Sequence, residues 1–528
     1  MSNHNSSQME IPKTSFKPDL FSINENPDSP FVHRFETKRN KYIYDANSMQ
    51  ILRVEPIVWN IISDIGIMNK DEIISKYSDL HSEIELLKAY NDIRDFQQNG
   101  LFLSQRPEHI FMPLTEEYIE NELSTNRQQL ILNVTDKCNF GCSYCQFNGS
   151  YRVDQSHSEQ RSMSWEVAQK AIDSYLASIK NSKLRSISFY GGEPLLNFEL
   201  IQKCVEYTPG QDIRYALTTN GSMLEGPIAD YLASNNFLMT VSLDGPKEIH
   251  DRYRRFKDGS PSWDKVIKNI YHYLEIQQRS NDNIGGMVLS CVMAPPLDVN
   301  CLDEYFHSFL QNHNVQIRTS SVNKMGTHFP QQPLYGLDVI KKKFSHNLQN
   351  GLINENPSDP KFTFQLALFD KPWIGFHKRF NLRTLCKPKS GDGHWCFPKC
   401  CCPTSTCVPG VRRTFVSVDG DYWPCERVLN TDYLKIGDIE HGFNITKIRQ
   451  LLADWVTMSS EQCRDCWCLP LCGVGCWSKV CAEKADQAEK LSACMNEQNA
   501  KHQLLIKYST VLENNPHALD YMKNITVM

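Results

Sequence analysis

Residues 138–145 read Cys-Asn-Phe-Gly-Cys-Ser-Tyr-Cys, directly after a short run of strand-forming residues at 130–135. The three thiols stand four and three positions apart, so one short loop can fold them around a single four-iron cluster. Three cysteines leave one iron without a protein ligand, and such an open iron can bind and reduce a small molecule. The stretch therefore predicts a strand followed by a cluster-binding loop, with Cys138, Cys142 and Cys145 as ligands.

Three further runs of strand character each end in a turn: residues 186–190 before Gly-Gly-Glu-Pro, 215–219 before Asn-Gly, and 239–243 before Asp-Gly. Two adjacent glycines let a backbone approach a ligand closely, because no Cβ stands in the way. Taken singly, these turns are ordinary turn chemistry. Their shared place at the ends of predicted strands favours a site instead, because barrel active sites lie at the C-terminal ends of the strands.

In this order the motifs resemble the radical S-adenosylmethionine (SAM) superfamily, in which the open iron chelates SAM and an electron from the cluster cleaves it to a 5′-deoxyadenosyl radical. The resemblance implies an α/β chain with an incomplete (β/α)6 barrel over about residues 127–325, its strands ending near positions 134, 190, 220, 244, 292 and 320. Arg254 matches the family position that binds the SAM carboxylate, although such a basic run is also typical of a solvated face. The other SAM contacts implied are Tyr144, Gly191, Gly192, Glu193, Asn220 and Ser242.

A second cysteine-rich block starts with Cys407, followed by Gly420 and Cys425, and continues with the spacing CX2CX5CX3C from position 463. It resembles the SPASM extension, which holds two auxiliary four-iron clusters. The resemblance assigns Cys407, Cys425 and Cys476 to one cluster, and Cys463, Cys466, Cys472 and Cys494 to the other. The first cluster then stays open or takes a fourth ligand, for which we choose Cys401. The triplet at 400–402 leaves that choice open.

Zinc is the main alternative for this block, because CX2C pairs also bind zinc tetrahedrally. The upstream barrel motifs favour iron. Disulfides are a third possibility, but no signal peptide precedes the chain, and the leftover Cys204, Cys291 and Cys301 fit a reducing cytosol. We therefore expect a cytoplasmic protein. Cys468 and Cys481 lie close enough to the predicted ligands to exchange with them. The cysteines without an assigned role are Cys386, Cys396, Cys400, Cys402, Cys468 and Cys481.

The composition fits a multidomain enzyme of 528 residues with 41% hydrophobic content. A net charge of −5 offers no signature of a polyanion-binding surface, and no apolar stretch approaches a membrane span. We therefore expect neither a nucleic-acid partner nor a membrane. Residues 1–29 are rich in Ser, Asn, Pro and Asp, which predicts a disordered tail.

Residues 30–107 are expected to form a separate winged-helix-like domain. Strand patterns at 33–37, 41–45 and 51–54 precede helix starts near 58, 71 and 82, and residues 101–103 are predicted as a closing strand. The layout resembles the leader-recognition domain of maturases acting on ribosomally made peptides, in which the leader adds a strand to the sheet edge. A DNA-binding winged helix or a structural cap is the alternative, although the charge lacks the basic face of a DNA reader.

The remaining segments complete the predicted organisation. Residues 326–395 bridge the two cysteine-bearing parts, and their frequent aromatic residues predict ordinary packing. The SPASM domain is expected over 396–500, and a C-terminal helix and tail over 501–528.

Joined together, these resemblances imply an oxidoreductase that abstracts hydrogen from a precursor peptide and depends on an electron donor of the flavodoxin or ferredoxin type. The stretches around 407–413 and 423–428 look like maturases of cysteine-rich peptides, so thioether crosslinking is our expected chemistry. Glu426, beside Cys425, is the candidate base; pairing with Arg412, Arg413 or Arg427 is its structural alternative.

Three other functions share some of these features. An anaerobic sulfatase maturase shares the barrel and the SPASM extension, but it carries Asp where this chain has Glu426, and the N-terminal domain also argues against it. Peptide C–C crosslinking or epimerisation is a variant of the leading hypothesis. A non-catalytic iron–sulfur electron carrier does not account for the complete set of SAM contacts.

Overall fold

The computed structural model describes residues 26–112, 115–145, 147, 161–208, 210, 212–279, 286–313, 315–322, 329, 334–385, 399–402, 406–428, 431–480 and 486–524. Of the tail expected at 1–29, residues 1–25 lie outside these ranges, as do Cys386, Cys396 and Cys481. Ser29 is buried and its hydroxyl donates to the Asn26 carbonyl, so the end of the expected tail is ordered. No helix within the described ranges is long and apolar enough to cross a membrane.

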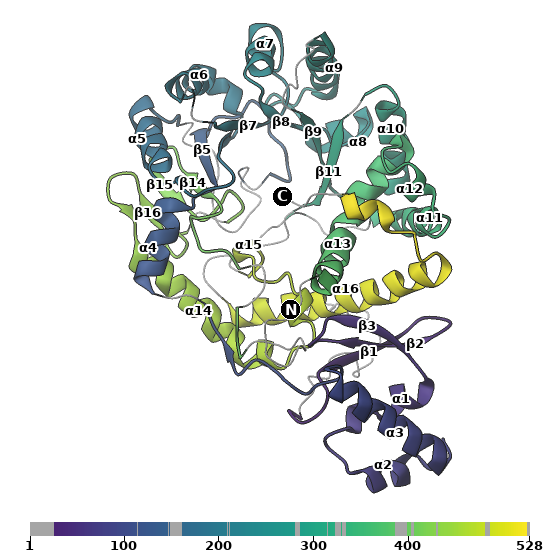
Figure 1. The fold of residues 1–528 in the computed structure, drawn as a ribbon. Helices are drawn as coiled ribbons and strands as arrows, with labels where there is room; N and C mark the ends of the chain where they lie inside the picture. The colour runs from purple at the N-terminus through teal and green to yellow at the C-terminus, as the bar shows by residue number, and fades with distance from the viewer. Residues whose placement is uncertain are drawn as a thin grey trace, which may run out of the picture.

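Six parallel strands form an incomplete barrel, each hydrogen-bonded to the next in chain order (Figure 1). These strands are β5 (Gln129–Thr135), β6 (Ser186–Gly191), β7 (Arg214–Thr219), β8 (Leu238–Ser242), β9 (Met287–Met293) and β11 (Gln316–Ser321). The helices outside the barrel are α5 (Trp165–Leu176), α6 (Phe198–Tyr207), α7 (Gly226–Ser234), α8 (Lys247–Tyr253), α9 (Trp263–Arg279) and α10 (Val299–Leu310). The predicted α/β class and its six barrel strands are confirmed.

Alternation along the strands separates a packed face from a polar interior. Ile187, Leu217 and Val241 are fully or almost fully buried in the main apolar cluster of the protein. Successive side chains of a strand point to opposite faces. The intervening Ser188 and Thr240 therefore face into the barrel, and this leaves a polar interior in which a ligand can lie.

The cysteine-rich part continues the same sheet. β14 (Thr414–Val416) pairs in parallel with β5, and the antiparallel strands β15 (Asp421–Trp423), β16 (Gly437–Asp438) and β17 (Gly442–Phe443) follow it. The sheet thus has ten strands in the order β11-β9-β8-β7-β6-β5-β14-β15-β16-β17. This pairing fixes the second cysteine block against the barrel.

Helices of the bridging region cover the other edge. α13 (Pro360–Leu385) packs on β11 and α10, with α11 (Leu337–Gln349) and α12 (Leu352–Glu355) beside it. The Thr319 hydroxyl of β11 donates a 3.0 Å hydrogen bond to the Ala367 carbonyl. Phe362, Phe364 and Trp373 are buried. The ordinary packing expected for this region is confirmed for these side chains.

The N-terminal lobe holds a three-stranded antiparallel sheet of β1 (Val32–Glu36), β2 (Lys41–Asp45) and β3 (Gln50–Val54). Its helices are α1 (Pro56–Ile61), α2 (Lys70–Tyr77) and α3 (Glu83–Gln98). Ser82 caps α3 and forms a capping box with Glu85, as the sequence predicts. Figure 1 shows the lobe below α16 (Gln487–Asn514), and β1 contacts that helix.

The closing strand expected at residues 101–103 is wrong. Phe102 has φ +54°, in the left-handed region, and this interrupts an extended backbone. Its amide donates to Asp45, while the Leu103 carbonyl accepts from the Phe31 amide. The segment therefore runs beside β1 as an irregular chain.

The remaining elements are α4 (Glu116–Thr125), α14 (Ile445–Arg464), α15 (Trp477–Val480), the short strands β4 (His109–Ile110), β10 (Leu297–Asp298), β12 (Leu334–Tyr335) and β13 (Cys400–Cys401), and the 3-10 turns η2 (Ile62–Asp64), η4 (Pro194–Asn197), η5 (Leu469–Leu471) and η6 (Asp520–Asn524). α16 begins well before the predicted C-terminal segment and joins it to the cysteine-rich part.

Candidate active site

The loop after β5 brings the first three cysteines together. Burial raises the pKa of Cys138 and of Cys142 to about 11, and it also raises the pKa of Cys145. Each thiol is further affected by another of the three, so the side chains lie close enough to interact electrostatically. Buried, converging thiols suit a metal centre, since a bound cation stabilises the thiolates.

The Gly191–Gly192 pair has a packing role. A Cβ on Gly191 would lie 2.3 Å from the Thr135 carbonyl oxygen, and one on Gly192 would lie 2.3 Å from that of Lys137. The Gly192 amide donates to Thr135 at 2.9 Å, and the amide of Glu193 donates to Lys137 at 2.8 Å. Only glycine allows this close approach, which fixes the start of the cysteine loop to the end of β6.

Glu193 is a fully buried carboxylate that holds the end of β7. One oxygen accepts from the Leu195 amide at 3.1 Å and from the Thr219 hydroxyl at 2.8 Å, and the other accepts from the Asn220 amide at 2.7 Å. Burial raises its pKa to about 7, although these hydrogen bonds and Arg254 act in the opposite direction. Its carboxylate is thus engaged with the protein itself.

Asn220 connects β7 with the cysteine loop. Its side-chain amide donates to Asn139 at 2.8 Å, and its carbonyl oxygen accepts from the Ser222 amide and hydroxyl. The Asn139 amide in turn donates to the Ser222 hydroxyl at 2.9 Å. This closed network fixes the loop that carries Cys138 and Cys142.

Arg254, the predicted contact of the SAM carboxylate, lies beside the same loop. Its Nε is 3.1 Å from Asp244 Oδ2, and its guanidinium lies 5.6 Å from the centre of the Tyr144 ring. The Tyr144 hydroxyl donates to the same Asp244 oxygen. Asp244 and its neighbours hold the pKa of Arg254 well above its usual value, so its charge persists despite burial.

Backbone pairing explains how Arg254 reaches the loop. The Gly141 amide donates to the Arg255 carbonyl at 2.9 Å, and the Lys257 amide donates to the Asn139 carbonyl at 3.0 Å. The segment at 254–257 therefore lies along the cysteine loop, and the solvated-face alternative does not apply to Arg254.

Two supporting residues had not been singled out from the sequence. Asp244 joins Tyr144 and Arg254 and also accepts from the Val292 amide of β9 at 3.0 Å. His250 is fully buried, with its Nε2 3.1 Å from the Ser262 hydroxyl, and burial lowers its pKa to about 3. The strand-to-turn position of Asp244 was the available signal, because it follows a barrel strand as Asn220 does.

Ser242 ends β8 and is paired in register with Ser290 of β9, on the interior face. Tyr190 faces the same interior from β6, opposite Asn133 of β5. Burial raises the pKa of Tyr190, and the Glu426 carboxylate and the Cys145 thiol raise it further. Tyr190 therefore lies close enough to both Cys145 and Glu426 to interact with them electrostatically.

Glu426 follows β15 and forms ion pairs with two arginines. Its Oε1 lies 2.6 Å from the Arg413 guanidinium and 3.6 Å from Arg427 Nε. Its buried Oε2 has no hydrogen-bond partner among the described residues. Arg318 of β11 lies close enough to interact electrostatically with all three charged groups. Glu426 thus forms the ion pairs of its structural alternative through one oxygen, while its other oxygen is buried without a hydrogen-bond partner among the described residues.

The second cysteine block divides into the two groups that the resemblance implies. Cys407 and Cys425 each interact electrostatically with Cys476, and burial raises the pKa of Cys425 to about 12. Cys466 and Cys472 interact with Cys463, and so does Cys494 of α16. The grouping agrees with one centre on the barrel side and one beside α16.

The neighbouring cysteines lie in different surroundings. Cys401 packs against the same apolar cluster as Cys463 and Cys466, whereas Cys407 and Cys425 pack against the main cluster. Cys468 is buried, and Cys400 and Cys402 are exposed. No three His, Cys, Asp or Glu side chains in the described ranges converge as one metal ion requires. The ligands of a four-iron cluster bind different irons and stand farther apart.

Comparisons with known proteins identify relatives of this chain. Residues 132–289 match the radical SAM superfamily. The chain is 28% identical over 316 residues to the radical SAM cyclopropyl synthase TigE of Paramaledivibacter caminithermalis, covering 55% of this chain and 62% of that one. It is 31% identical over 368 residues to a cysteine-type anaerobic sulfatase-maturating enzyme of Clostridium perfringens, covering 66% of this chain and 88% of that one.

Among solved structures, native anSMEcpe with bound AdoMet aligns with a TM-score of 0.48 at 21% identity, covering 75% of this chain and 100% of that one. The matched region spans less than two thirds of several relatives, with 62% of the cyclopropyl synthase and 48% and 33% of two others.

Proposed function

Because this chain belongs to the radical SAM superfamily and is related to the sulfatase-maturating enzymes, we propose that it modifies a ribosomally synthesised precursor peptide by hydrogen abstraction. The observation that carries this proposal is the pairing of β14 with β5, which joins the second cysteine block to the strand that leads into the first. Two cysteine-bearing sites on one sheet can act on one substrate placed between them.

SAM and one four-iron cluster are the cofactors of this superfamily, and the first site fits them. Cys138, Cys142 and Cys145 would hold the cluster, which supplies the electron that cleaves SAM. Arg254 presents a charge-assisted donor for the SAM carboxylate. Glu193 and Asp244 act indirectly, because their hydrogen bonds fix Asn220, Tyr144 and Arg254 around the loop.

The second block is proposed to hold two auxiliary clusters. The ligands of one cluster would be Cys407, Cys425 and Cys476, and those of the other Cys463, Cys466, Cys472 and Cys494. Cys401 is kept as the proposed fourth ligand of the first cluster, although it packs against the same apolar cluster as Cys463 and Cys466. Electron acceptance or binding of a substrate thiolate is the chemistry that these groups would supply. An external donor of the flavodoxin or ferredoxin type would provide the reducing electrons.

A thioether is the product that we propose. One hydrogen leaves the substrate carbon with the radical, and closing the S–C bond releases one thiol proton and one electron. Glu426 would take the proton, since its Oε2 is free among the described residues while Arg413 holds the other oxygen at 2.6 Å. General-base assistance is worth about 10²–10⁴-fold.

The N-terminal lobe is proposed to bind the leader of the precursor. In the described part of the chain β3 pairs with β2 alone, so its other edge can accept a further strand. Binding there would raise the effective concentration of the core peptide at the barrel. The DNA-binding and capping alternatives predict no peptide affinity.

A second candidate is formylglycine formation, favoured by the match to 88% of a sulfatase-maturating enzyme. The relationship to a cyclopropyl synthase equally favours a C–C bond as the product. These chemistries share the hydrogen abstraction and differ in the bond formed afterwards.

Coexpression with a candidate short cysteine-rich precursor peptide would separate these outcomes. Loss of two hydrogens together with one alkylatable thiol supports a thioether, whereas loss of two hydrogens with all thiols retained indicates a C–C bond. An aldehyde that reacts with hydrazide indicates formylglycine. SAM cleavage with an unmodified peptide would count against the maturase proposal.

The metal content tests the auxiliary sites separately. Anaerobically purified protein should contain about twelve irons per chain, because three four-iron clusters are proposed. Two zincs with about four irons would reject the auxiliary clusters and leave the radical SAM site unaffected.

A further inference from the structure

The N-terminal lobe contacts the cysteine-rich part around Cys466. Side chains of the two parts make these contacts directly. Figure 1 shows the sheet of β1, β2 and β3 against α16, the helix that carries Cys494. Two residues of the lobe, His33 and Arg106, contact the residues immediately on either side of Cys466. The two contacts are of different kinds.

The first contact is an aromatic stack. The His33 ring of β1 lies parallel to the Trp467 ring, with centroids 3.7 Å apart and 7° between the planes. At the edge of its ring, His33 Nε2 is 2.8 Å from Nδ1 of His502 in α16. Tyr44 of β2 adds an edge contact to Trp467 at 6.1 Å. Burial lowers the pKa of His33 to about 3, so the stacked ring is neutral near neutral pH.

The second contact is an ion pair. Arg106 Nε lies 3.3 Å from Asp465 Oδ1, and only 6% of the Arg106 side chain is exposed. The guanidinium also donates to the Ser29 and Ser104 carbonyls and lies 4.8 Å from the centre of the Phe31 ring. Asp465 is thereby tied to the lobe while Trp467 is held by the stack.

α16 contacts the same two regions. Its Gln498 side chain donates to Cys466 Sγ at 3.1 Å, and Glu497 accepts from the Gly473 amide at 2.9 Å, next to Cys472. Nearer its end, Glu513 accepts from Thr37, Asn40 and Tyr42 of the lobe. One continuous helix therefore contacts both the cysteine loop and the lobe.

We propose that the N-terminal lobe is a structural part of the auxiliary site beside α16, in which His33 and Arg106 act as positioning residues for the loop of Cys466. The inference rests on the proposed auxiliary clusters only for its iron readout. It adds to leader recognition, because the same lobe that would hold the peptide also holds the geometry of a cysteine site. Removing or displacing the lobe would then change that site.

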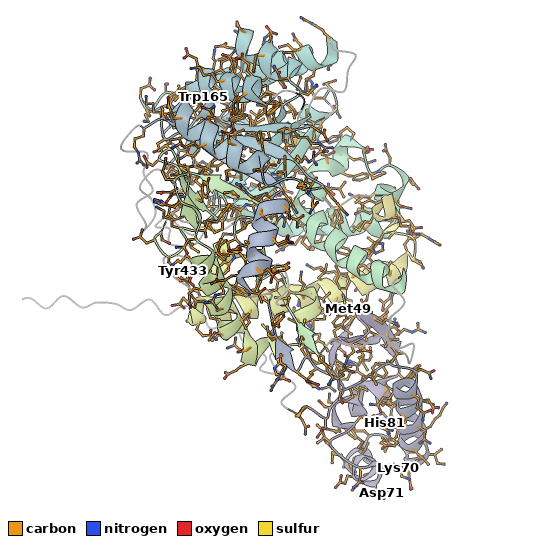
Figure 2. All side chains as sticks on the ribbon, turned by 60° about the vertical axis from the view of Figure 1, so that its left-hand side comes forward. Met49, Lys70, Asp71, His81, Trp165 and Tyr433 are labelled. Carbon is orange, nitrogen blue, oxygen red and sulfur yellow. The ribbon has the colours of Figure 1, made fainter. Side chains whose placement is uncertain are left out.

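The test uses the full chain with Cys138, Cys142 and Cys145 replaced by Ala, so that only the second block can bind iron. His33→Ala removes the stack and the contact to His502. His33→Phe keeps a ring on Trp467 and loses only the contact to His502. His81→Ala is the matched control, since His81 lies at the outer end of the lobe, where it hydrogen-bonds Asn60, whereas Met49 lies nearer α16 (Figure 2).

The first readout is the alkylation rate of Cys466 in iron-free protein, mapped by mass spectrometry with N-ethylmaleimide as the probe. Losing an aromatic stack shifts a local equilibrium about two- to tenfold, so His33→Ala should raise the rate by that factor. His33→Phe should restore most of the protection, and His81→Ala should leave the rate unchanged. Equal rates in the parent and His33→Ala would overturn the proposal, whatever metal the protein binds.

The second readout is the electron paramagnetic resonance spectrum of the reduced, iron-loaded proteins. His33→Ala should alter the line shape or lose part of the auxiliary signal relative to His81→Ala. An identical spectrum and iron content in all variants would also reject the positioning role. If the parent binds no iron while His33→Ala still exposes Cys466, the positioning role stands and the auxiliary clusters fail.

Discussion

Glu193→Gln should remove the part of the free energy of unfolding that depends on the protonation of Glu193 and falls as pH rises. Glu193 is fully buried, and its pKa is about 7 in the folded protein against 4.5 ordinarily. Because the folded pKa lies above the unfolded one, the folded state holds the proton more tightly, and stability falls as pH rises between these values. The full difference corresponds to about 3.4 kcal/mol, of which about 1.4 kcal/mol is lost between about pH 6 and 8.

Glutamine replaces the carboxylate with a group that does not titrate. Its oxygen can still accept from Leu195 and Thr219, but its amide faces the Asn220 amide as a second donor. An unsatisfied buried donor costs about 1–3 kcal/mol. The variant should therefore be less stable than wild type at pH 6, and the difference should shrink by about 1.4 kcal/mol at pH 8.

The assay is anaerobic denaturant unfolding of the iron-loaded protein, followed by circular dichroism at about pH 6, 7 and 8. Glu248→Gln makes the same substitution at an exposed position of α8 and serves as the control. Its stability should run parallel to that of wild type at every pH. Parallel curves for wild type and Glu193→Gln would refute the reasoning, because they would show that Glu193 does not titrate in this range.

Three other substitutions test the site. Replacing Cys138, Cys142 and Cys145 together by Ala should abolish 5′-deoxyadenosine formation and lower iron from about twelve to about eight per chain; product at the wild-type rate would disprove their role. Glu426→Gln should retain SAM cleavage while mature peptide falls by about 10²-fold or more, and an unchanged yield in a peptide mass assay would return Glu426 to a structural role. Gly192→Ala should lower the free energy of unfolding by about 1–3 kcal/mol and slow SAM cleavage, because the new Cβ would lie 2.3 Å from the Lys137 carbonyl oxygen. Gly375→Ala is the control, since a Cβ there would have nothing within 4 Å. It should behave as wild type in the same thermal unfolding and activity assays.

The barrel and its first site were predictable because short motifs carry them. A strand followed by a special turn is a local signal, and parallel strands bring such turns to one edge. The sequence therefore named Arg254 and Asn220 as SAM contacts, and the structure places both beside the cysteine loop. Their binding of SAM stays a prediction. It could not show that Gly192 packs against Lys137, since that contact joins segments far apart in the chain.

Long-range pairing was the part that the sequence did not reveal. β14 is only three residues long and carries no motif that names β5 as its partner. The sequence did not indicate the role of Asp244 for a similar reason. Asp244 orients Tyr144 and Arg254, which come from other segments of the chain. The composition of residues 101–103 likewise predicts a strand. Phe102 has a left-handed backbone conformation, and the segment is therefore irregular.

The contacts of the lobe change what a truncation experiment can show. Deleting residues 1–107 would remove the proposed leader site, but it would also remove His33 and Arg106 and uncover the apolar surface around Trp467 and Tyr508. Loss of peptide modification in such a protein would then have two causes. Proline substitutions along β3 separate them, because β3 lies at the far edge of the sheet from β1, where His33 contacts Trp467. Impaired peptide binding with unchanged Cys466 alkylation would assign the loss to recognition, whereas a defect found only in the truncated protein would assign it to the cysteine site.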